Sequence, residues 1–236
     1  MVDRTALQLQ NVSKSYGKYP ALKSLDLKVS SGQIVALFGH NGAGKSTLLR
    51  VLSMAHRPDT GHLSILNADS IQYKSWCKAR VGDVGHTNYM YPDLSPTENL
   101  IFFARLYGVP DYKTRVSRLL ENLDLTEMAE QPLRNLSHGQ QKRTALARAV
   151  VHEPSILLLD EPDAGLDIHA QELMRSLIKH ISANGGTVLF SSHDPHSSLT
   201  LANEFLLLRK GHLITHSTNS YSSKNELLKD LYTAEP

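Results

Sequence analysis

The sequence contains little that could cross-link the chain or anchor it in a membrane. Cys77 is the only cysteine among the 236 residues, which excludes an internal disulfide and a cysteine metal cluster. No apolar run approaches the roughly 18 residues that indicate a membrane-spanning helix, and the N-terminus lacks the apolar core of a signal peptide. We therefore expect the chain to stay in the cytoplasm and to reach any membrane through a partner.

The charge balance gives no reason to expect a nucleic-acid partner. The formal net charge is +2, which is too small to argue for nucleic acid by itself. Lys142 and Arg143 are adjacent, and a solvated helix face explains the pair better than nucleic-acid contact does. The hydrophobic content of 41% and the length suit one large domain or two tightly joined lobes.

A glycine-rich stretch between two apolar patterns carries the strongest signal. The apolar run 34–38 predicts a buried strand, and apolar residues after Thr47 recur at helical spacing. Gly39 and Gly44 lie between them, and Lys45 and Ser46 follow at once. Strand, glycine loop and helix in this order form a P-loop, whose backbone N–H groups surround a phosphate. A chance glycine-rich turn is the alternative, which the flanking elements disfavour.

The P-loop predicts that the chain binds a nucleoside triphosphate. Lys45 would reach the terminal phosphates, and Ser46 would give its hydroxyl to Mg²⁺. The residues expected to contact the nucleotide form one continuous run: Gly39, His40, Asn41, Gly42, Ala43, Gly44, Lys45, Ser46 and Thr47.

Two carboxylates follow a second apolar run, at residues 156–159. Asp160 and Glu161 end this predicted strand, where ligands bind in an open α/β sheet. One carboxylate can complete the Mg²⁺ shell begun by Ser46, and the next can orient or deprotonate an attacking water. A helix N-cap is the alternative reading of the pair, but Asp167 suits that role better.

Two further features can be interpreted as parts of a phosphate site once the P-loop is recognised. His193 follows a buried strand predicted at 187–190 and would lie near the γ-phosphate. The run 136–140 (Leu-Ser-His-Gly-Gln) precedes a predicted helix, so the Ser137 hydroxyl and helix N–H groups converge as a second anion site. Because this run lies far in sequence from Lys45, it indicates a second copy of the protein that supplies it in trans.

Periodicity and capping patterns predict the remaining elements. Antiparallel strands are expected near 7–12 and 25–29, joined by a turn-rich link at 14–20. Tyr16 in that link is either a surface aromatic or a stacking platform for an adenine ring. No strand pattern appears between about 87 and 150, which predicts a helical subdomain inserted into an α/β core. Further expectations are helices begun by Ser95, Asp167 and Asp194, helices at 112–123 and around Leu227, Leu228 and Leu231, strands at 62–66, 81–85 and 204–208, and a loop at 215–225.

Together these motifs resemble the nucleotide-binding subunit of an ATP-binding cassette (ABC) transporter. Residues 39–47 match the Walker A motif of that family, 157–161 its Walker B motif with the catalytic glutamate, and 136–140 its signature motif. Residues 164–167 resemble its D-loop. The resemblance also covers His193 as the switch histidine and Tyr16 as the adenine-stacking tyrosine. It extends over almost the whole chain.

The resemblance implies an architecture. It is an α/β P-loop NTPase core at 1–86 and 151–236, a mixed sheet with helices on both faces and an N-terminal antiparallel β patch. A helical subdomain at 87–150 carries the signature motif.

The resemblance also implies an activity and partners. Two subunits, expected to be identical, would close head to tail, so that each ATP lies between one P-loop and the other subunit's Ser137, Gly139 and Gln140. The cofactors are ATP and Mg²⁺, the metal being held by Ser46 and Asp160. Glu161 and His193 would be the catalytic residues. Hydrolysis would power separate membrane permease subunits from the cytoplasmic face, with no nucleic acid involved.

Three residues depart from the family pattern. His86 stands where a Q-loop glutamine is expected, so its part in binding Mg²⁺ and water is in doubt. His138 replaces a glycine of the signature motif, and Ala164 replaces a D-loop serine. Ser137 and Gly139 are retained, and we expect hydrolysis to survive all three changes.

The segment from Gly85 to Gly108 is similar to one branch of the family, the ATPase subunit of the heme exporter in cytochrome c maturation. Drug, lipid and polysaccharide exporters are the alternatives, because the substrate is chosen by membrane subunits. A soluble regulatory ABC ATPase is a further class, although such proteins usually carry two cassettes. A P-loop GTPase or kinase is disfavoured by the signature motif and by the lack of an Asn-Lys-x-Asp motif.

Overall fold

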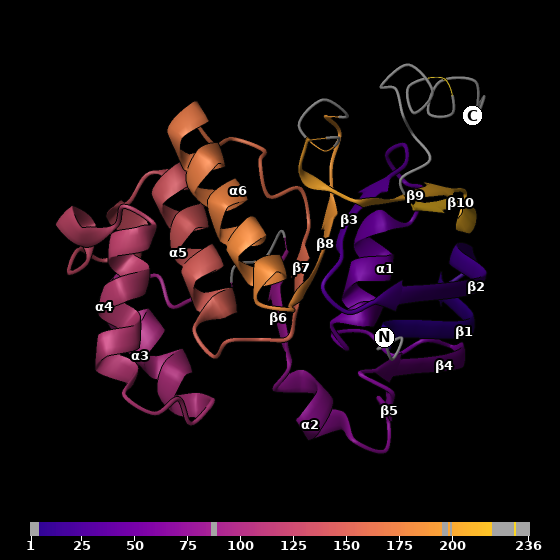
Figure 1. The fold of residues 1–236 in the computed structure, drawn as a ribbon, viewed down its shortest axis with the longest axis horizontal. Coiled ribbons are helices and arrows are strands. Elements are labelled where there is room, and N and C mark those ends of the chain that lie inside the picture. The colour runs from indigo at the N-terminus through magenta and orange to yellow at the C-terminus, as the bar shows by residue number, and fades with distance from the viewer. Residues whose placement is uncertain (1–4, 86–88, 195–197, 199, 219–228, 230–236) are drawn as a thin grey trace.

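Two β-sheets form the framework of the computed structural model, which describes residues 5–85, 89–194, 198, 200–218 and 229 (Figure 1). The first sheet is antiparallel, in the order β2-β1-β4-β5, and the second has the order β10-β9-β3-β8-β7-β6. In the second sheet β10 is antiparallel to β9, and the other neighbours are parallel. The strands are β1 (Thr5–Tyr16), β2 (Tyr19–Ser30), β3 (Ile34–Phe38), β4 (Thr60–Ile65), β5 (Ala68–Asp69), β6 (Val81–Val84), β7 (Ile156–Leu159), β8 (Thr187–Ser191), β9 (Glu204–Arg209) and β10 (His212–Thr218).

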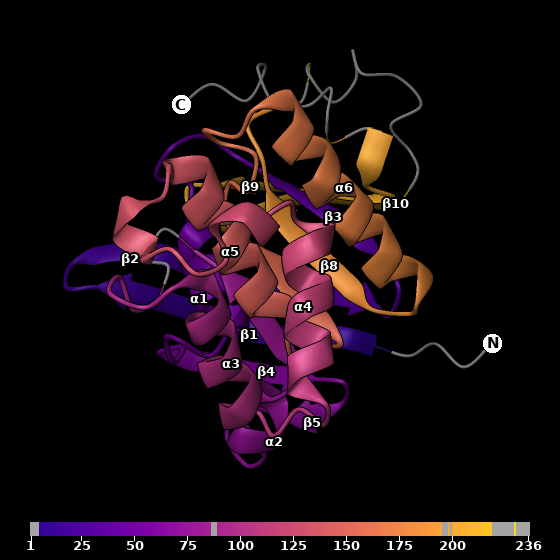
Figure 2. The same ribbon diagram turned by 90° about the vertical axis from the view of Figure 1, so that its left-hand side faces the viewer.

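Helices cover both faces of the second sheet. One helix lies between the two sheets, two cover the opposite face, and a further pair packs outside those two (Figures 1 and 2). The helix between the sheets is α1 (Lys45–Leu52), and those on the opposite face are α5 (His138–Val150) and α6 (Ile168–Ala183). The outer pair is α3 (Pro96–Leu106) and α4 (Tyr112–Asn122). The short elements are α2 (Lys74–Lys78) and 3₁₀ turns at Thr126–Met128 and Leu133–Asn135. Within the described residues, no helix is long and apolar enough to cross a bilayer.

Strand β3 separates two hydrophobic cores. All five of its residues are buried, as expected for a strand covered on both faces. Val35 and Leu37 face α1 and the antiparallel sheet, whereas Ala36 and Phe38 face α5, α6 and the outer helices. The predicted architecture, a mixed sheet with helices on both faces and a preceding antiparallel patch, is confirmed.

Two predicted helix starts are confirmed in detail. The Ser95 Oγ accepts a hydrogen bond from the Glu98 N–H at 3.2 Å, and Glu98 Oε2 accepts one from the Ser95 N–H at 2.8 Å. This reciprocal pair is the capping box that begins α3. Asp167 Oδ1 accepts from the Ala170 N–H at 2.8 Å and begins α6.

The turn-rich link predicted at 14–20 is wrong. Strands β1 and β2 continue pairing as far as Tyr16 and Tyr19, so that only Gly17 and Lys18 remain in the turn. Gly17 has a positive φ of 58°, which a two-residue hairpin turn needs. Backbone pairing with a neighbouring strand thus overrides the weak strand propensity of this polar segment.

Part of the loop predicted at 215–225 is also a strand. β10 extends to Thr218 because its backbone pairs with β9 along the sheet edge. The short β5 and α2 were not predicted. The described residues from 89 to 150 contain helices and turns but no strand, while the subdomain boundaries at 87 and 150 stay predictions. Position 86, residue 195 at the start of the helix predicted after Asp194, and Leu227, Leu228 and Leu231 lie outside the described residues.

Asn99 organises the segment that leads into α3. Its fully buried side chain donates to the Tyr91, Leu94 and Ser95 carbonyls at 3.0, 3.2 and 3.0 Å, and its Oδ1 accepts from the Tyr91 N–H at 2.9 Å. Asn99→Ala leaves these groups without their partner, so we expect the free energy of unfolding to fall by about 2–4 kcal/mol. Denaturant unfolding followed by circular dichroism measures this.

The exposed Asn122 at the end of α4 provides a matched control. Asn122→Ala should change the free energy of unfolding by less than about 0.5 kcal/mol. Equal losses in the two variants would contradict the role given to Asn99.

Candidate functional site

The loop after β3 is shaped by glycines that no other residue could replace without movement. Gly39 and Gly44 have φ values of 150° and 109°. A Cβ atom on Gly39 would lie 2.4 Å from the Leu208 carbonyl oxygen, and one on Gly44 would lie 2.5 Å from that of Ala21. The backbone therefore approaches both neighbours more closely than a side chain allows.

The N-terminus of α1 leaves backbone donors for a ligand. Gly44 is the N-cap, and no side chain caps the first turn. His40, Asn41 and Gly42 form an exposed tip, and the Ala43 N–H donates back to the His40 carbonyl at 3.0 Å. Uncapped N–H groups at the positive end of a helix are what a phosphate requires.

Lys45 lies between the P-loop and two carboxylates. Its side chain is buried, and Nζ donates to the Gly39 carbonyl at 2.7 Å. Burial lowers the pKa of Lys45 from its ordinary value, while the charges of Glu161 and Asp160 act in the opposite direction. The fold therefore brings the P-loop lysine into electrostatic reach of both predicted carboxylates.

The Ser191 hydroxyl holds the two carboxylate residues in place. It donates to Asp160 Oδ1 at 2.7 Å and accepts from the Glu161 N–H at 2.8 Å. Ser191 ends β8, next to β7, and is fully buried. Sequence reasoning gave Ser191 no role, although its place directly after the strand predicted at 187–190, two residues before His193, was an available signal.

Glu161 has a backbone conformation that side chains disfavour. Its φ is 49°, in the left-handed region, which costs about 1–3 kcal/mol for a residue other than glycine. His193 Nε2 lies 2.5 Å from Glu161 Oε1. The structure thus places the imidazole directly on the carboxylate, and a position near the γ-phosphate stays a prediction.

The residues present fit Mg²⁺ as a nucleotide-bound ion. In the described part of the chain, no group of three or more His, Cys, Asp or Glu side chains could hold a metal alone. Ser46 and Asp160 offer hard oxygen atoms, and Mg²⁺ usually combines one or two carboxylates with phosphate oxygens and water. The doubtful third group, His86, lies outside the described residues.

Tyr16 stands at the tip of the β1–β2 hairpin. Its hydroxyl lies 2.7 Å from Nδ1 of His56, which follows α1, and 41% of Tyr16 is exposed. Farther along the same hairpin, the Ala21 carbonyl packs against Gly44. The tyrosine is therefore tied to the P-loop helix by a partner, His56, that the sequence did not indicate.

The predicted signature motif lies on the other side of the sheet from the P-loop. Ser137 is an exposed N-cap of α5; its Oγ accepts from the Gln140 N–H at 3.3 Å, and Gln140 Oε1 accepts from the Ser137 N–H at 2.8 Å. Gly139 is in the first turn of the helix. Because α5 and α1 cover opposite faces (Figure 1), the fold does not bring this motif to Lys45 of the same chain.

The solvated face predicted for Lys142 and Arg143 is wrong. Lys142 Nζ donates to the Glu161 and Ala164 carbonyls at 2.8 and 2.5 Å. Arg143 Nη1 donates to the Leu123 carbonyl at 2.9 Å and to Asp124. Both cations instead bind carbonyl groups where neighbouring segments end, and such partners are distant in sequence.

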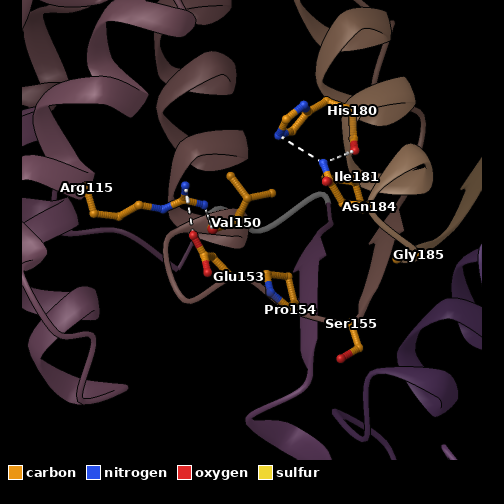
Figure 3. A pocket seen from close by; sticks show the side chains of 10 residues that line it. Arg115, Val150, Glu153, Pro154, Ser155, His180, Ile181, Asn184 and Gly185 are labelled. Carbon is orange, nitrogen blue, oxygen red and sulfur yellow. Dashed lines mark hydrogen bonds and ion pairs between the residues drawn. The ribbon is translucent and has the colours of Figure 1, made fainter.

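A hollow of about 500 Å³ lies near the ends of α5 and α6 (Figure 3). Ser155 and Gly186 line it, immediately before the first residues of β7 and β8. Arg115 donates to the Val150 carbonyl at 2.9 Å and pairs with Glu153 at 3.2 Å, so its charge is used within the protein. The hollow joins the ends of α5 and α6 and is separate from the candidate site.

Comparison with known proteins agrees with this geometry. Residues 22–164 match a family model described as ABC transporter. The chain belongs to this family. It is one of the family's ATP-binding ATPase domains, and it has the ABC ATPase fold: a P-loop core with an antiparallel β subdomain and a helical subdomain.

The similar proteins include ATP-binding proteins named for import and for export. The chain is 36% identical over 208 residues to a sulfate/thiosulfate import ATP-binding protein of Thermosynechococcus vestitus, covering 87% of this chain and 62% of that protein. It is 36% identical over 210 residues to a Nod factor export ATP-binding protein of Cupriavidus metallidurans, covering 88% and 69%. It is 29% identical to the ATP-binding protein NatA of Bacillus subtilis, covering 89% and 87%.

Solved ABC structures superpose closely. An ATP-binding subunit of an ABC transporter matches with a TM-score of 0.89 and 25% identity, covering 96% of this chain and 99% of the other. A dimeric ATP-binding cassette in a post-hydrolysis state, bound to ADP and phosphate, matches with a TM-score of 0.83 and 26% identity, covering 90% and 98%.

Gly39→Ala tests the close backbone packing of the P-loop. Its Cβ would clash with the Leu208 carbonyl, so the loop must shift, and we expect the Kd for ATP to rise at least about tenfold because aligned N–H donors are lost. Titration with a fluorescent ATP analogue measures this.

Gly42→Ala is the matched control, since it also has a positive φ of 79° but nothing within 4 Å of a Cβ. Its strain of about 1 kcal/mol should weaken binding less than tenfold. If the two variants bind ATP equally, steric packing at Gly39 is not the controlling factor.

Proposed function

We propose that this chain binds ATP with Mg²⁺ and hydrolyses it in a head-to-tail dimer. The single observation that carries the proposal is that α1, which follows the P-loop, and α5, which Ser137 begins, cover opposite faces of one sheet (Figure 1). We infer that the chain carries two separate half-sites. The P-loop, Asp160 and Glu161 form one half, and Ser137 at the start of α5 belongs to the other. Two copies related by a twofold axis can complete both sites at once.

Each residue then has a chemical role. The P-loop N–H groups and Lys45 bind the phosphates, while Tyr16 stacks on the adenine. Ser46 and Asp160 would hold Mg²⁺, which when bound supplies charge neutralisation at the phosphates. Glu161 orients the attacking water and accepts its proton, and His193 positions that carboxylate through the 2.5 Å contact.

The Glu161→Gln variant tests the catalytic assignment. It keeps the shape of the side chain but removes the base, so we expect turnover of ATP to fall at least about a hundredfold while ATP binding remains. Phosphate release from the purified chain and its membrane partner measures turnover. Size-exclusion chromatography with ATP should show the variant as a dimer.

Glu172→Gln on the exposed side of α6 is the control, and it should hydrolyse ATP like the wild type. Wild-type turnover by Glu161→Gln would contradict the assignment. If the unaltered chain with its membrane partner shows no turnover that Glu161→Gln removes, the expectation that hydrolysis survives the changes at His86, His138 and Ala164 is wrong.

We further propose that the dimer powers separate membrane permease subunits and works on the cytoplasmic face of a membrane. An exposed aromatic patch supports this docking. Tyr91 and Phe102 are 48% and 41% exposed, and their rings meet edge to face at 5.1 Å. Leu106, on the same helix, is 68% exposed. Clustered apolar side chains at a surface mark interaction sites.

Phe102→Asp tests this patch. A charge at a buried apolar contact costs several kcal/mol, so we expect at least about a tenfold loss of the chain from purified membranes, with ATP hydrolysis by the free chain unchanged. Ile214→Asp on edge strand β10, where Ile214 is 52% exposed, is the control. Membrane binding that survives Phe102→Asp would contradict docking through this patch. An unaltered chain that does not bind the membranes would favour the alternative, a soluble regulatory ABC ATPase.

These similarities do not identify the cargo, because one relative named for import and one named for export are equally identical to the chain. Heme export in cytochrome c maturation stays a prediction that rests on the segment from Gly85 to Gly108. Normal cytochrome c levels in a deletion strain would remove it, and the membrane subunit that copurifies would identify the cargo class.

A further inference from the structure

The main-chain amide and carbonyl of Glu161 are held from opposite sides by two side chains. The Ser191 hydroxyl accepts from its N–H at 2.8 Å. Its carbonyl accepts from Lys142 Nζ at 2.8 Å and from the Ala164 N–H at 3.3 Å. Because φ is 49° at this residue, the local backbone would relax toward another conformation without such contacts.

The Lys142 ammonium group binds a second carbonyl oxygen beside that of Glu161. Its Nζ also donates to the Ala164 carbonyl at 2.5 Å, so one ammonium group closes the turn between Glu161 and Ala164. Burial lowers the pKa of Lys142, while the charges of Asp163, Glu161 and Asp160 act in the opposite direction. An ammonium group that is partly shielded from water needs such acceptors, and it binds them more strongly there than at a fully solvated surface.

The first turn of α5 also contacts residues that follow Glu161 in the chain. A Cβ on Gly165 would lie 3.3 Å from the ring of His138, and one on Gly139 would lie 3.9 Å from Leu166. The first turns of α5 and residues 161–166 therefore pack as one unit. Within this unit, Lys142 donates hydrogen bonds to the Glu161 and Ala164 carbonyls.

We propose that Lys142 is a positioning residue for Glu161. It holds the Glu161 carbonyl, and thereby directs the Glu161 side chain toward the water that attacks the γ-phosphate. It touches neither ATP nor the water itself. The inference deepens the proposed function and rests on the catalytic role proposed there for Glu161.

Lys142→Met tests the inference, because it keeps an unbranched side chain out to Cε and removes the ammonium donors. A misplaced base reacts slowly but leaves the nucleotide contacts intact, so kcat for ATP should fall about ten- to a hundredfold while KM changes less than about twofold. Lys142→Arg can donate to both carbonyls and should recover kcat to within about fivefold of the wild type.

Arg143→Met is the matched control, since Arg143 is the next residue of α5 and binds carbonyl groups at Leu123 and Asp124, away from Glu161. It should lower Tm about as much as Lys142→Met but keep kcat within about threefold of wild type. In the Glu161→Gln background, adding Lys142→Met should cause no further loss, because both changes act on one group.

The outcomes separate the two proposals. A Lys142→Met kcat within threefold of wild type, or equal losses of kcat in Lys142→Met and Arg143→Met, overturns the inference and leaves the catalytic role of Glu161 standing. A further loss in the double variant also overturns it, since Lys142 would then act elsewhere. Wild-type turnover by Glu161→Gln alone defeats the proposed function, and the inference with it.

Discussion

The parallel register of three buried strands is the constraint on which the candidate site depends. Leu37 pairs with Ser191, and Leu159 pairs with Phe190, so β3, β8 and β7 end at one edge of the sheet. Each strand then delivers one part of the site: the P-loop, the Ser191 hydroxyl, and Asp160 with Glu161. A shift of one residue in any pair would turn these side chains to the other face.

Residues whose partners are near in sequence were predictable. The glycine loop and its lysine occupy one short segment between a strand and a helix, and local backbone geometry explains each residue type in it. The same holds for the caps at Ser95 and Asp167, whose hydrogen bonds reach three residues along the chain. Local signals also indicated the strand ends at Asp160 and His193, and thus most of the site.

Residues whose partners are distant were misread or missed. Lys142 and Arg143 look like a solvated basic pair, because nothing near them shows that they bind carbonyls 19 to 22 residues away. Ser191 bridges two carboxylate residues 30 and 31 positions earlier. A lysine that binds main-chain oxygen leaves no complementary charge in the sequence, so only the packed structure reveals it.

Helix α5 is related in two different ways to the nucleotide sites: through its N-terminus and through Lys142. Its N-terminus begins with the exposed Ser137, yet it lies across the sheet from the P-loop of its own chain. Lys142, four residues after His138, donates to the main-chain carbonyl of Glu161. In a head-to-tail dimer, one end of the helix would contact the partner's nucleotide, while Lys142 in its second turn holds the main-chain carbonyl of the chain's own Glu161. Lys142 therefore links the helix that would meet the partner's nucleotide to the residue proposed to act on the chain's own nucleotide.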